Sequence, residues 1–508
     1  MPVYINNATK LSLIFVLYVI TPCLLIAQEA SLAPKNEMRG VWVATVANID
    51  WPSQPGLKVK EQKAEALQII RHSKQLGLNA IFLQVRPASD VLYKSVYEPW
   101  SKVLTGEAGK SPKYDPLKYW IELAHADGLE LHAWINPYRA SMNMRDELPA
   151  KHPYHDTPEM FVEYGNKLYF NPGHPDANTH INKVVKELVE NYAIDGIHMD
   201  DYFYPYPVSG QVFPDSMYYE RYGQMQFDDI ADWRRENVNQ TIRSIQATIQ
   251  STKPWVQFGI SPFGVWRNKT DDPLGSDTKA GTTNYDGLYA DVLKWMQNGW
   301  IDYVVPQLYW GTSHPVANYL VLVNWWNENS CGLPVYIGHG IYKIGSDKAD
   351  WQDVQQLPSQ LGLVRSSSNL NGSVFFSYKH LKRDLLGLQD SLINNFYQTK
   401  ALAIYGANSQ SAALAGDVEK LKATRRKIKW KSTNNDNAAP EKYIIYRYQA
   451  FDAFSPDDAR FILDVVYDTK YRIPKRTNGF VRQYIIRVAA LGAGNTEGTL
   501  SEPLVVEF

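Results

Sequence analysis

The sequence predicts an α/β protein in which a (β/α)8 barrel is followed by a small all-β sandwich. Three observations predict this fold class. Between residues 39 and 391, short β-branched or aromatic apolar runs alternate with longer amphipathic stretches, as in repeated strand and helix units. From about residue 406, strand-like runs follow one another with only turn-rich polar stretches between them. The 508 residues are also sufficient for more than one domain.

Eight strands are expected in the first region. They are residues 39–45, 80–87, 129–136, 196–202, 256–263, 303–309, 335–340 and 373–378. Helices are expected at 60–75, 116–126, 180–192 and 233–249, where apolar residues recur at three- and four-residue spacing. Eight parallel strands with intervening helices form a TIM barrel, whose active site is built by the loops that follow the strands. The longest of these loops are expected at 141–174 and 204–227, within a barrel domain predicted to span 36–398.

The C-terminal region, residues 406–508, is predicted to be a separate all-β domain. Its expected strands are 427–431, 443–448, 461–467, 484–491 and 504–508, with polar turns at 432–439 and 492–498. Trp430 on an early strand and the closing Ser501-Glu502-Pro503 resemble a fibronectin type III domain. Such a domain is usually an accessory module, so it indicates no chemistry.

The N-terminal segment predicts the compartment. Lys10 precedes an apolar run over 11–26 and polar residues follow, which is the pattern of a secretory signal peptide at 1–28. The run is shorter than the roughly 20 residues that cross a bilayer, so no stable membrane insertion is expected. Lipid anchoring is not expected because Pro22 precedes Cys23, where a small residue is needed. The mature chain is predicted to be exported, periplasmic or extracellular, with Cys331 alone and therefore no disulfide.

Composition excludes some partners. Lys and Arg number 52 against 53 Asp and Glu, so no basic surplus attracts nucleic acid or a membrane surface. Aromatic residues make up 13% of the chain, and rings that the core does not use often serve as stacking platforms for ligands. A neutral or small partner is therefore expected, and the oligomeric state is not indicated.

The end of the fourth strand carries the strongest chemical signal. Asp200 and Asp201 stand side by side there, and a ring-rich segment follows them. Alternation along a strand places His198 and Asp200 on one side and Asp201 on the other, unless a bulge or the strand end re-aims it. If His198 and Asp200 point into the barrel, Asp200 is the better candidate for the reacting carboxylate. Alternatively, one aspartate caps the loop or pairs with Arg139. Glycosidic cleavage needs two carboxyl groups with different pKa values, and closeness itself raises one of those values.

Polar and aromatic residues at other strand ends form the expected substrate-binding set. They are Asp50, Arg86, Asp90, His132, Asn136, Tyr138, Arg139, His198, Tyr204, Trp266, Asp286, Gln307, Tyr309 and Trp310. Groups that read hydroxyls beside Trp and Tyr rings suit a sugar, which has a polar rim and apolar faces. Each residue alone is weak evidence, and the accumulation at six strand ends supports the prediction.

A metal site is the main rival. The first strand has no His-x-His pair, but His132, His198, His339 and His380 lie near strand ends and could converge on a metal with Asp200. No glycine-rich phosphate loop and no Gly-x-Ser-x-Gly motif occurs. No metal and no cofactor are therefore expected.

Several motifs resemble the glycosyl-hydrolase-like 10 family of bacterial envelope proteins. They are MRGVWV at 38–43, DWP at 50–52, QVRP at 84–87, NPYR at 136–139, NPG at 171–173, DGIHMDDYFYP at 195–205, GISPFGVWRN at 259–268, NYD at 284–286 and WIDY at 300–303. The resemblance covers the whole barrel. It implies a retaining or inverting hydrolase for an amino-sugar polymer, because at least one member acts on peptidoglycan glycan strands that lack stem peptides.

The fourth strand is also similar to those of α-amylases and α-galactosidases, which implies that Asp200 is the nucleophile. Strands five and six carry no carboxylate for the acid, so Asp201 is the first choice, with Asp50, Asp90 and Asp286 as alternatives. The sequence thus predicts an exported glycoside hydrolase that cleaves peptidoglycan or another amino-sugar polysaccharide. The alternatives are a metal-dependent hydrolase or deacetylase in the same barrel, and a non-catalytic glycan-binding protein.

Overall fold

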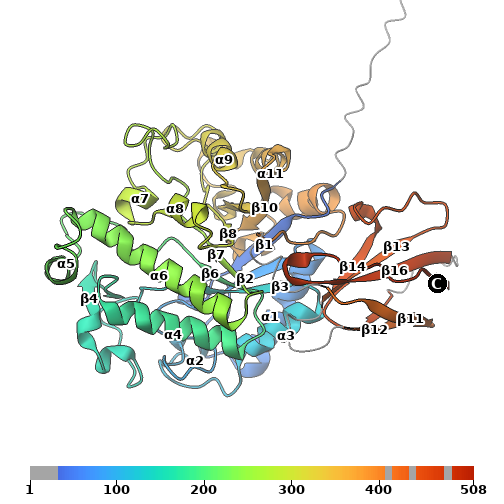
Figure 1. Cartoon of the computed structure of the whole chain (residues 1–508), viewed down its shortest axis with the longest axis horizontal. Coiled ribbons are helices and arrows are strands. Elements are labelled where there is room, and N and C mark those ends of the chain that lie inside the picture. The colour runs from blue at the N-terminus through green and yellow to red at the C-terminus, as the bar shows by residue number, and fades with distance from the viewer. Residues whose placement is uncertain (1–32, 407–414, 434–441, 474–482, 508) are drawn as a thin grey trace, which may run out of the picture. The chain divides into compact units, whose positions relative to one another are not determined.

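The computed structural model describes residues 33–406, 415–433, 442–473 and 483–507. Within these ranges, eight parallel strands close into a barrel in the order β1-β10-β9-β8-β7-β6-β3-β2 (Figure 1). The strands are β1 (Met38–Val43), β2 (Ala80–Arg86), β3 (Glu130–Ile135), β6 (Gly196–Met199), β7 (Gln257–Ile260), β8 (Tyr303–Val304), β9 (Val335–His339) and β10 (Leu370–Phe375). Each overlaps a predicted strand, so the predicted fold class is confirmed.

Helices surround the barrel (Figure 1). They are α1 (Val59–Gln75), α2 (Lys102–Thr105), α3 (Pro116–Ala126), α4 (Pro175–Asn191), α5 (Ser216–Tyr222), α6 (Ile230–Thr252), α7 (Asn284–Gly287), α8 (Val292–Gln297), α9 (Tyr319–Glu328), α10 (Ala349–Gln352), α11 (Gln356–Ser366), α12 (Tyr378–Lys382) and α13 (Leu388–Ser391). The helix predicted at 180–192 begins earlier, at Pro175. Proline suits the first helical turn, and the His174 side chain accepts a hydrogen bond from the Asp176 backbone N–H.

The long loop predicted at 141–174 contains an antiparallel hairpin, β4 (Phe161–Tyr164) and β5 (Lys167–Phe170). Its turn residues Gly165 and Asn166 both have positive φ, at 55° and 61°. A two-residue turn with both φ values positive matches the right-handed twist of the two strands, and Gly and Asn adopt it most readily. The loop after β3 is therefore a folded unit.

The C-terminal region consists of two antiparallel sheets, which confirms its all-β prediction. One is β11 (Val418–Thr424), β12 (Lys427–Ser432) and β15 (Lys470–Arg472), and the other is β14 (Ile462–Val466), β13 (Lys442–Tyr448), β16 (Gln483–Leu491) and β17 (Leu504–Glu507). Ile428, Trp430, Tyr443 and Val488 are among the residues buried in their shared core. The likeness to fibronectin type III domains stays a prediction.

The C-terminal sheets contact residues at the start of barrel strands. The ammonium group of Lys442 lies 2.5 Å from Oε1 of Glu130, the first residue of β3. The hydroxyl of Tyr467 donates to Oδ1 of Asp195, just before β6, at 2.9 Å. Gly128 permits this approach, because a Cβ there would lie 2.0 Å from the Val465 carbonyl oxygen. The sheets therefore contact the end of the barrel opposite the ends that carry Asp200 and Asp201.

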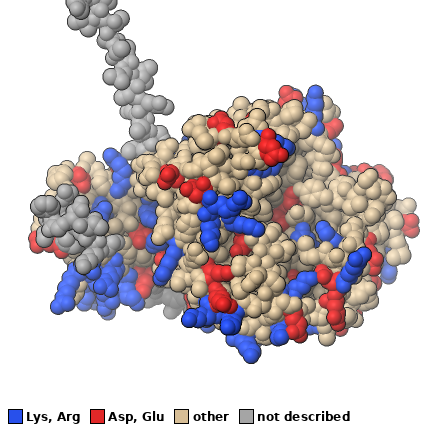
Figure 2. Space-filling view, turned by 180° about the vertical axis from the view of Figure 1, so that it is seen from behind, with Lys and Arg blue, Asp and Glu red and all other residues tan. Residues whose placement is uncertain are grey.

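Charge is unevenly distributed on the C-terminal sheets. Lys427 and Lys429 on β12 are exposed and lie opposite Arg472 and Lys470 on β15. Figure 2 shows Lys and Arg gathered over this part of the molecule, whereas both signs are mixed over the barrel. Like charges on paired strands oppose sheet formation, and Lys470 lies 2.9 Å from the carboxylate of Asp468, which offsets part of this repulsion.

No helix in the part of the chain that the structure describes has the length and apolar character needed to cross a bilayer. The predicted signal peptide at 1–28 lies outside the described residues. The predicted domain boundaries stay predictions.

Candidate active site

Asp200 and Asp201 follow the last residue of β6 and lie at the carboxyl end of the barrel. Their exposed fractions are 5% and 3%. The barrel topology explains this position, because the loops at the carboxyl ends of the strands surround the mouth of a (β/α)8 barrel. The two carboxyl groups therefore lie low in the mouth, largely shielded from bulk water.

A chain of hydrogen bonds across four strand ends orients Asp200. The backbone N–H groups of Thr45 and Val46 donate to Oε1 of Gln84 at 3.1 and 2.9 Å. Nε2 of Gln84 then donates to Oδ1 of Asn136 at 2.9 Å, and Nδ2 of Asn136 donates to Oδ2 of Asp200 at 2.8 Å. Each amide is thereby fixed in one orientation, since its oxygen already accepts. Oδ2 of Asp200 is held as an acceptor at short distance, whereas Oδ1 accepts only a longer hydrogen bond, from the Tyr202 backbone N–H at 3.4 Å, and is the oxygen better placed to carry a proton.

Asp201 is held from the opposite side. The Tyr206 hydroxyl donates to its Oδ2, and the Gln307 side chain also hydrogen-bonds the carboxyl group. The Arg139 guanidinium stacks 4.3 Å from the centre of the Tyr202 ring. Among the described residues, neither carboxyl group of the pair forms an ion pair. The alternative in which Arg139 locks one of them in a salt bridge is therefore not what the structure shows.

Burial raises both pKa values, and the charge of Asp201 adds to the rise at Asp200. Burial, followed by the charge of Asp201, raises the pKa of Asp200 to about 7. Burial raises the pKa of Asp201 to about 6, although the hydrogen bond from Tyr206 lowers it. The positive charge of Arg139 lowers both pKa values. Because two close acids do not both ionise readily, the pair holds one proton near neutral pH.

Half-buried rings stand at the neighbouring strand ends. Tyr206, Phe263 and Trp310 form one series, with ring centres 6.2 and 5.4 Å apart. Tyr309 and Phe376 form another, stacked at 6.0 Å. The carboxylates of the pair raise the pKa of Tyr309, which places that ring within electrostatic reach of them. The mouth therefore combines acids, amides and ring faces.

The structure brings some of the expected substrate-binding residues to the carboxyl pair. Asn136 and Gln307 hydrogen-bond it, Arg139 and Tyr309 interact with it electrostatically, and Trp310 stands on the ring wall.

Other expected substrate-binding residues have partners elsewhere. Two of them form ion pairs: Arg86 with Glu98 at 2.6 Å, and Asp286 with Arg267 at 2.8 Å. The Tyr138 hydroxyl donates a hydrogen bond to Thr241. The rings of Tyr204 and Trp266 pack on other rings, Tyr204 on Phe213 and Tyr289 and Trp266 on Trp325. His132 and His198 are fully buried inside the barrel, where both contact the Tyr303 hydroxyl. None of these seven described residues hydrogen-bonds the carboxyl pair, although Arg86 also donates to the backbone carbonyl oxygens of Asn136 and Pro137.

Asp50 and Asp90 were alternatives for the acid. Asp50 lies between β1 and the segment after β10, where it accepts hydrogen bonds from the Ala44 and Lys379 backbone N–H groups and from Ser377. Burial raises its pKa to about 6. Burial also raises the pKa of Asp90, whose carboxyl group hydrogen-bonds Ser101. Neither is hydrogen-bonded to the carboxyl pair.

Sequence reasoning missed five residues of this site: Gln84, Tyr202, Tyr206, Phe263 and Phe376. Gln84 belongs to the QVRP motif on which the family resemblance rests. Its hydrogen bond to Asn136, however, depends on how far β2 and β3 extend relative to each other. The two tyrosines lie in the ring-rich segment after the carboxylates, and this segment was the signal available. Phe376 follows directly on β10 and carried no signal beyond its aromatic character.

Three of the four histidines considered for a metal site hydrogen-bond other side chains, and the ring of His380 lies 6.0 Å from that of Tyr342. His339 bonds Ser373 and Gln360, and His198 bonds Ser261. Among the described residues, no group of three or more His, Cys, Asp or Glu side chains is arranged to hold a metal ion.

Comparison with known proteins gives the family. The model of the family described as glycosyl hydrolase-like 10 matches residues 37–354. The chain belongs to this family. Glycosyl hydrolase YngK of Bacillus subtilis (strain 168) is 48% identical over 378 residues, covering 73% of this chain and 74% of its own length. Glycosyl hydrolase DigH of Escherichia coli (strain K12) is 37% identical over 372 residues, covering 68% and 84%. The predicted family resemblance is confirmed.

Two solved structures are also similar to this glycosyl hydrolase-like 10 chain. The glycoside hydrolase domain of PgaB (BpsB) from Bordetella bronchiseptica aligns with 70% of the chain and 99% of its own, at 14% identity and a TM-score of 0.46. The catalytic domain of β-amylase from Paenibacillus polymyxa aligns with 72% and 99%, at 13% identity and a TM-score of 0.48.

Proposed function

We propose that the protein is an exported glycoside hydrolase that cleaves an amino-sugar glycan, with peptidoglycan glycan strands as its substrate. One observation carries this proposal: two adjacent carboxyl groups are buried at the end of β6 beside a wall of half-buried rings, and their pKa values are raised to about 7 and about 6. Glycosidic cleavage needs one protonated and one ionised carboxyl group, and this pair supplies both.

The hydrogen bonds favour a division of labour within the pair. Asp201 accepts from Tyr206, Gln307 and its own backbone N–H, and such donors stabilise the charged form. Asp200 accepts one short hydrogen bond, from Asn136. The shared proton therefore resides on Asp200, which acts as general acid, and Asp201 supplies the negative charge. The likeness to other barrel glycosidases implied the reverse assignment, so each carboxyl group needs its own test.

The nature of the mouth supports a saccharide substrate. The ring faces of Tyr206, Phe263 and Trp310 suit the apolar faces of a sugar, and the pair and its amides suit hydroxyl groups. The relatives are named glycosyl hydrolases, and their names give no substrate.

The test is incubation with purified peptidoglycan glycan strands, with and without stem peptides, followed by the masses of the products. Asp200→Asn and Asp201→Asn are each expected to lower kcat by about 100-fold or more, whereas KM changes little. Asp457→Asn, whose side chain is 91% exposed on the C-terminal domain, serves as the matched control. Binding without any release of reducing ends would replace this proposal with a glycan-binding function.

The two roles are separated with an aryl glycoside that has a good leaving group. A variant that lacks the general acid keeps most of its rate on such a substrate, because the leaving group needs no proton. Asp200→Asn is expected to behave in this way, and Asp201→Asn is expected to stay slow. The opposite result would assign the acid to Asp201.

A further inference from the structure

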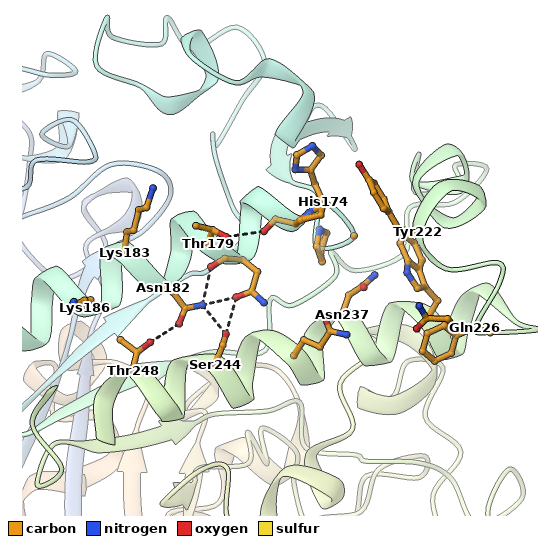
Figure 3. A pocket seen from close by; sticks show the side chains of 17 residues that line it. His174, Thr179, Asn182, Lys183, Lys186, Tyr222, Gln226, Asn237, Ser244 and Thr248 are labelled. Carbon is orange, nitrogen blue, oxygen red and sulfur yellow. Dashed lines mark hydrogen bonds between the residues drawn. The ribbon is translucent and has the colours of Figure 1, made fainter. Parts of the chain in front are cut away.

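A groove runs along the outside of the barrel between α4 and α6 (Figure 3). Its volume of about 660 Å³ lies in the range of ligand-binding pockets. Asn178 and Asn182 on α4 face Ser244 and Thr248 on α6, and a hydrogen-bond ladder joins them. In each helix these short side chains are four residues apart and share one face, so the helices leave a channel above them.

One end of the groove is aromatic. Tyr222 is 39% exposed there, and Trp233 and Phe227 line the same end. The Trp233 ring is fixed by close packing, because a Cβ at Gly173 or Gly223 would lie 2.3 or 2.5 Å from it. A fixed ring beside an exposed one offers the kind of platform on which sugar faces stack.

The remaining lining is polar and leaves groups free. The side-chain amides of Gln226 and Gln240 make no hydrogen bond to another described residue. Lys183 is exposed and has no ion pair within the described ranges, while Lys186 lies 3.6 Å from Glu190 in an exposed pair. Among the described residues that line the groove, none is Asp or Glu. The groove therefore offers amides and positive charge, which suit a hydroxylated anion.

The groove shares a chain segment with the candidate active site. The segment between β6 and α6 begins with the carboxyl pair and later contributes Tyr222 and Gln226. Both α4 and α6 begin at the side of the barrel where the strands end, so the aromatic end of the groove lies on the side of the mouth. From Trp233 to Thr248 the helix rises about 22 Å, which is room for several sugar rings.

We propose that this groove is a second glycan-binding site, which holds the part of a carboxylate-bearing amino-sugar strand that extends beyond the bond being cleaved. Tyr222 stacks on a sugar face, Gln226 and Gln240 bind its polar groups, and Lys183 and Lys186 pair with its carboxylates. A peptidoglycan strand without stem peptides carries free carboxylates where the peptides were attached. The inference rests on the proposed function, which names that substrate.

The experiment uses the full chain in two forms. In the inactive Asp200→Asn chain, Tyr222→Ala is expected to weaken binding of peptide-free glycan strands by about three- to tenfold. Lys183→Gln is expected to weaken it by about two- to fivefold and to reduce its dependence on salt. The controls are Phe451→Ala, at an 83% exposed ring of the C-terminal domain, and Lys118→Gln on α3, and both should bind as before.

In the active chain, the same two groove variants are expected to raise KM for long strands by similar factors. Their kcat/KM for oligosaccharides that fill only the barrel mouth should not change. Neutral oligomers of N-acetylglucosamine should bind less tightly than the carboxylate-bearing strands.

The outcomes separate the two claims. If the groove variants bind and cleave long strands like the unaltered chain, the second site is overturned and the glycosidase stands. If the unaltered chain cleaves nothing while the groove variants still weaken strand binding, the proposed enzymatic function fails and the groove stands. Equal affinity for neutral oligomers would overturn the roles given to the two lysines.

Discussion

Tyr206→Phe is expected to change the pH dependence of catalysis, because it removes the hydroxyl that donates to Oδ2 of Asp201. That hydrogen bond is the largest influence opposing the burial that raises the pKa of Asp201 to about 6. A hydrogen bond to a charged group contributes about 1.5 to 3 kcal/mol, and one pH unit corresponds to about 1.36 kcal/mol. Without the hydroxyl, the pKa of Asp201 should rise further, by about one to two pH units.

The assay is the pH profile of kcat/KM on soluble glycan oligosaccharides, which reports the pKa values of the free enzyme. If Asp201 works in its ionised form, the acidic limb of the profile moves upward by that amount. If Asp201 instead supplies the proton, the basic limb moves upward. The profile thus distinguishes the two assignments of the carboxyl pair.

Tyr138→Phe is the matched control, because it also removes a buried hydroxyl, one that donates to Thr241 away from the carboxyl pair. It should lower stability slightly and leave both limbs in place. A Tyr206→Phe profile that coincides with that of the unaltered enzyme would refute the reasoning, since the hydroxyl would then not stabilise the charge on Asp201.

Three further predictions follow from the buried charges and the histidine contacts. Asp200→Asn should raise the free energy of unfolding at pH 8 by at most about 4 kcal/mol and less at pH 5, measured with urea. The pKa of Asp200 in the folded state exceeds its unfolded value of about 3.9. The unaltered chain is therefore most stable below that pH and loses stability as the pH rises through about 7. Equal free energies of unfolding for the two chains at pH 8 would contradict this. Lys442→Met should cost about 3 to 5 kcal/mol, because the buried Glu130 charge loses its ammonium partner and keeps its contacts with Asn495 and His132; Glu130→Gln should restore part of it in the double variant. A chelator should leave cleavage unchanged, and loss of activity that zinc restores would favour a metal-dependent hydrolase.

Most of the barrel could be predicted because buried parallel strands are nearly continuous apolar runs. Three strands are much shorter than predicted: β6 and β7 end at Met199 and Ile260, and β8, expected at 303–309, is regular only over Tyr303–Val304. Pro306 has no backbone N–H to donate, so the ladder breaks there, although Gln307 still donates to the Pro262 carbonyl oxygen at 3.0 Å.

Other elements gave too weak a pattern. Strand β11 exposes most of its residues and shows no alternation, and β15 has three residues, so neither produced a periodic signal. The β4–β5 hairpin did contain a turn signal in Gly165 and Asn166, but its strands are only four residues long. Short strands that depend on tertiary packing are poorly marked by local sequence.

The candidate site was predictable in its carboxylates but not in its hydrogen bonds. Alternation grouped His198 with Asp200 on one side of the strand but did not fix which side faces inward; the structure places His198 fully buried inside the barrel. The chain of hydrogen bonds from Gln84 through Asn136 to Asp200 requires neighbouring strands to end at matching positions. The register between strands of the closed barrel sets these positions. The return of Tyr206 onto Asp201 depends on the path of a loop, for which sequence periodicity carries no information.

One loop connects the two sites proposed for the glycan. After the carboxyl pair and Tyr206, the same segment is anchored by Asp215, which accepts from the Arg234 guanidinium at 2.9 and 2.5 Å on the first turns of α6. Beyond this anchor it continues through α5 to Tyr222. A buried bidentate ion pair holds a chain segment in one geometry, so the acids and the aromatic end of the groove keep a fixed separation. A strand bound in the groove would therefore meet the acids in a defined register, and the positions of cleavage along a long strand would be set by this loop.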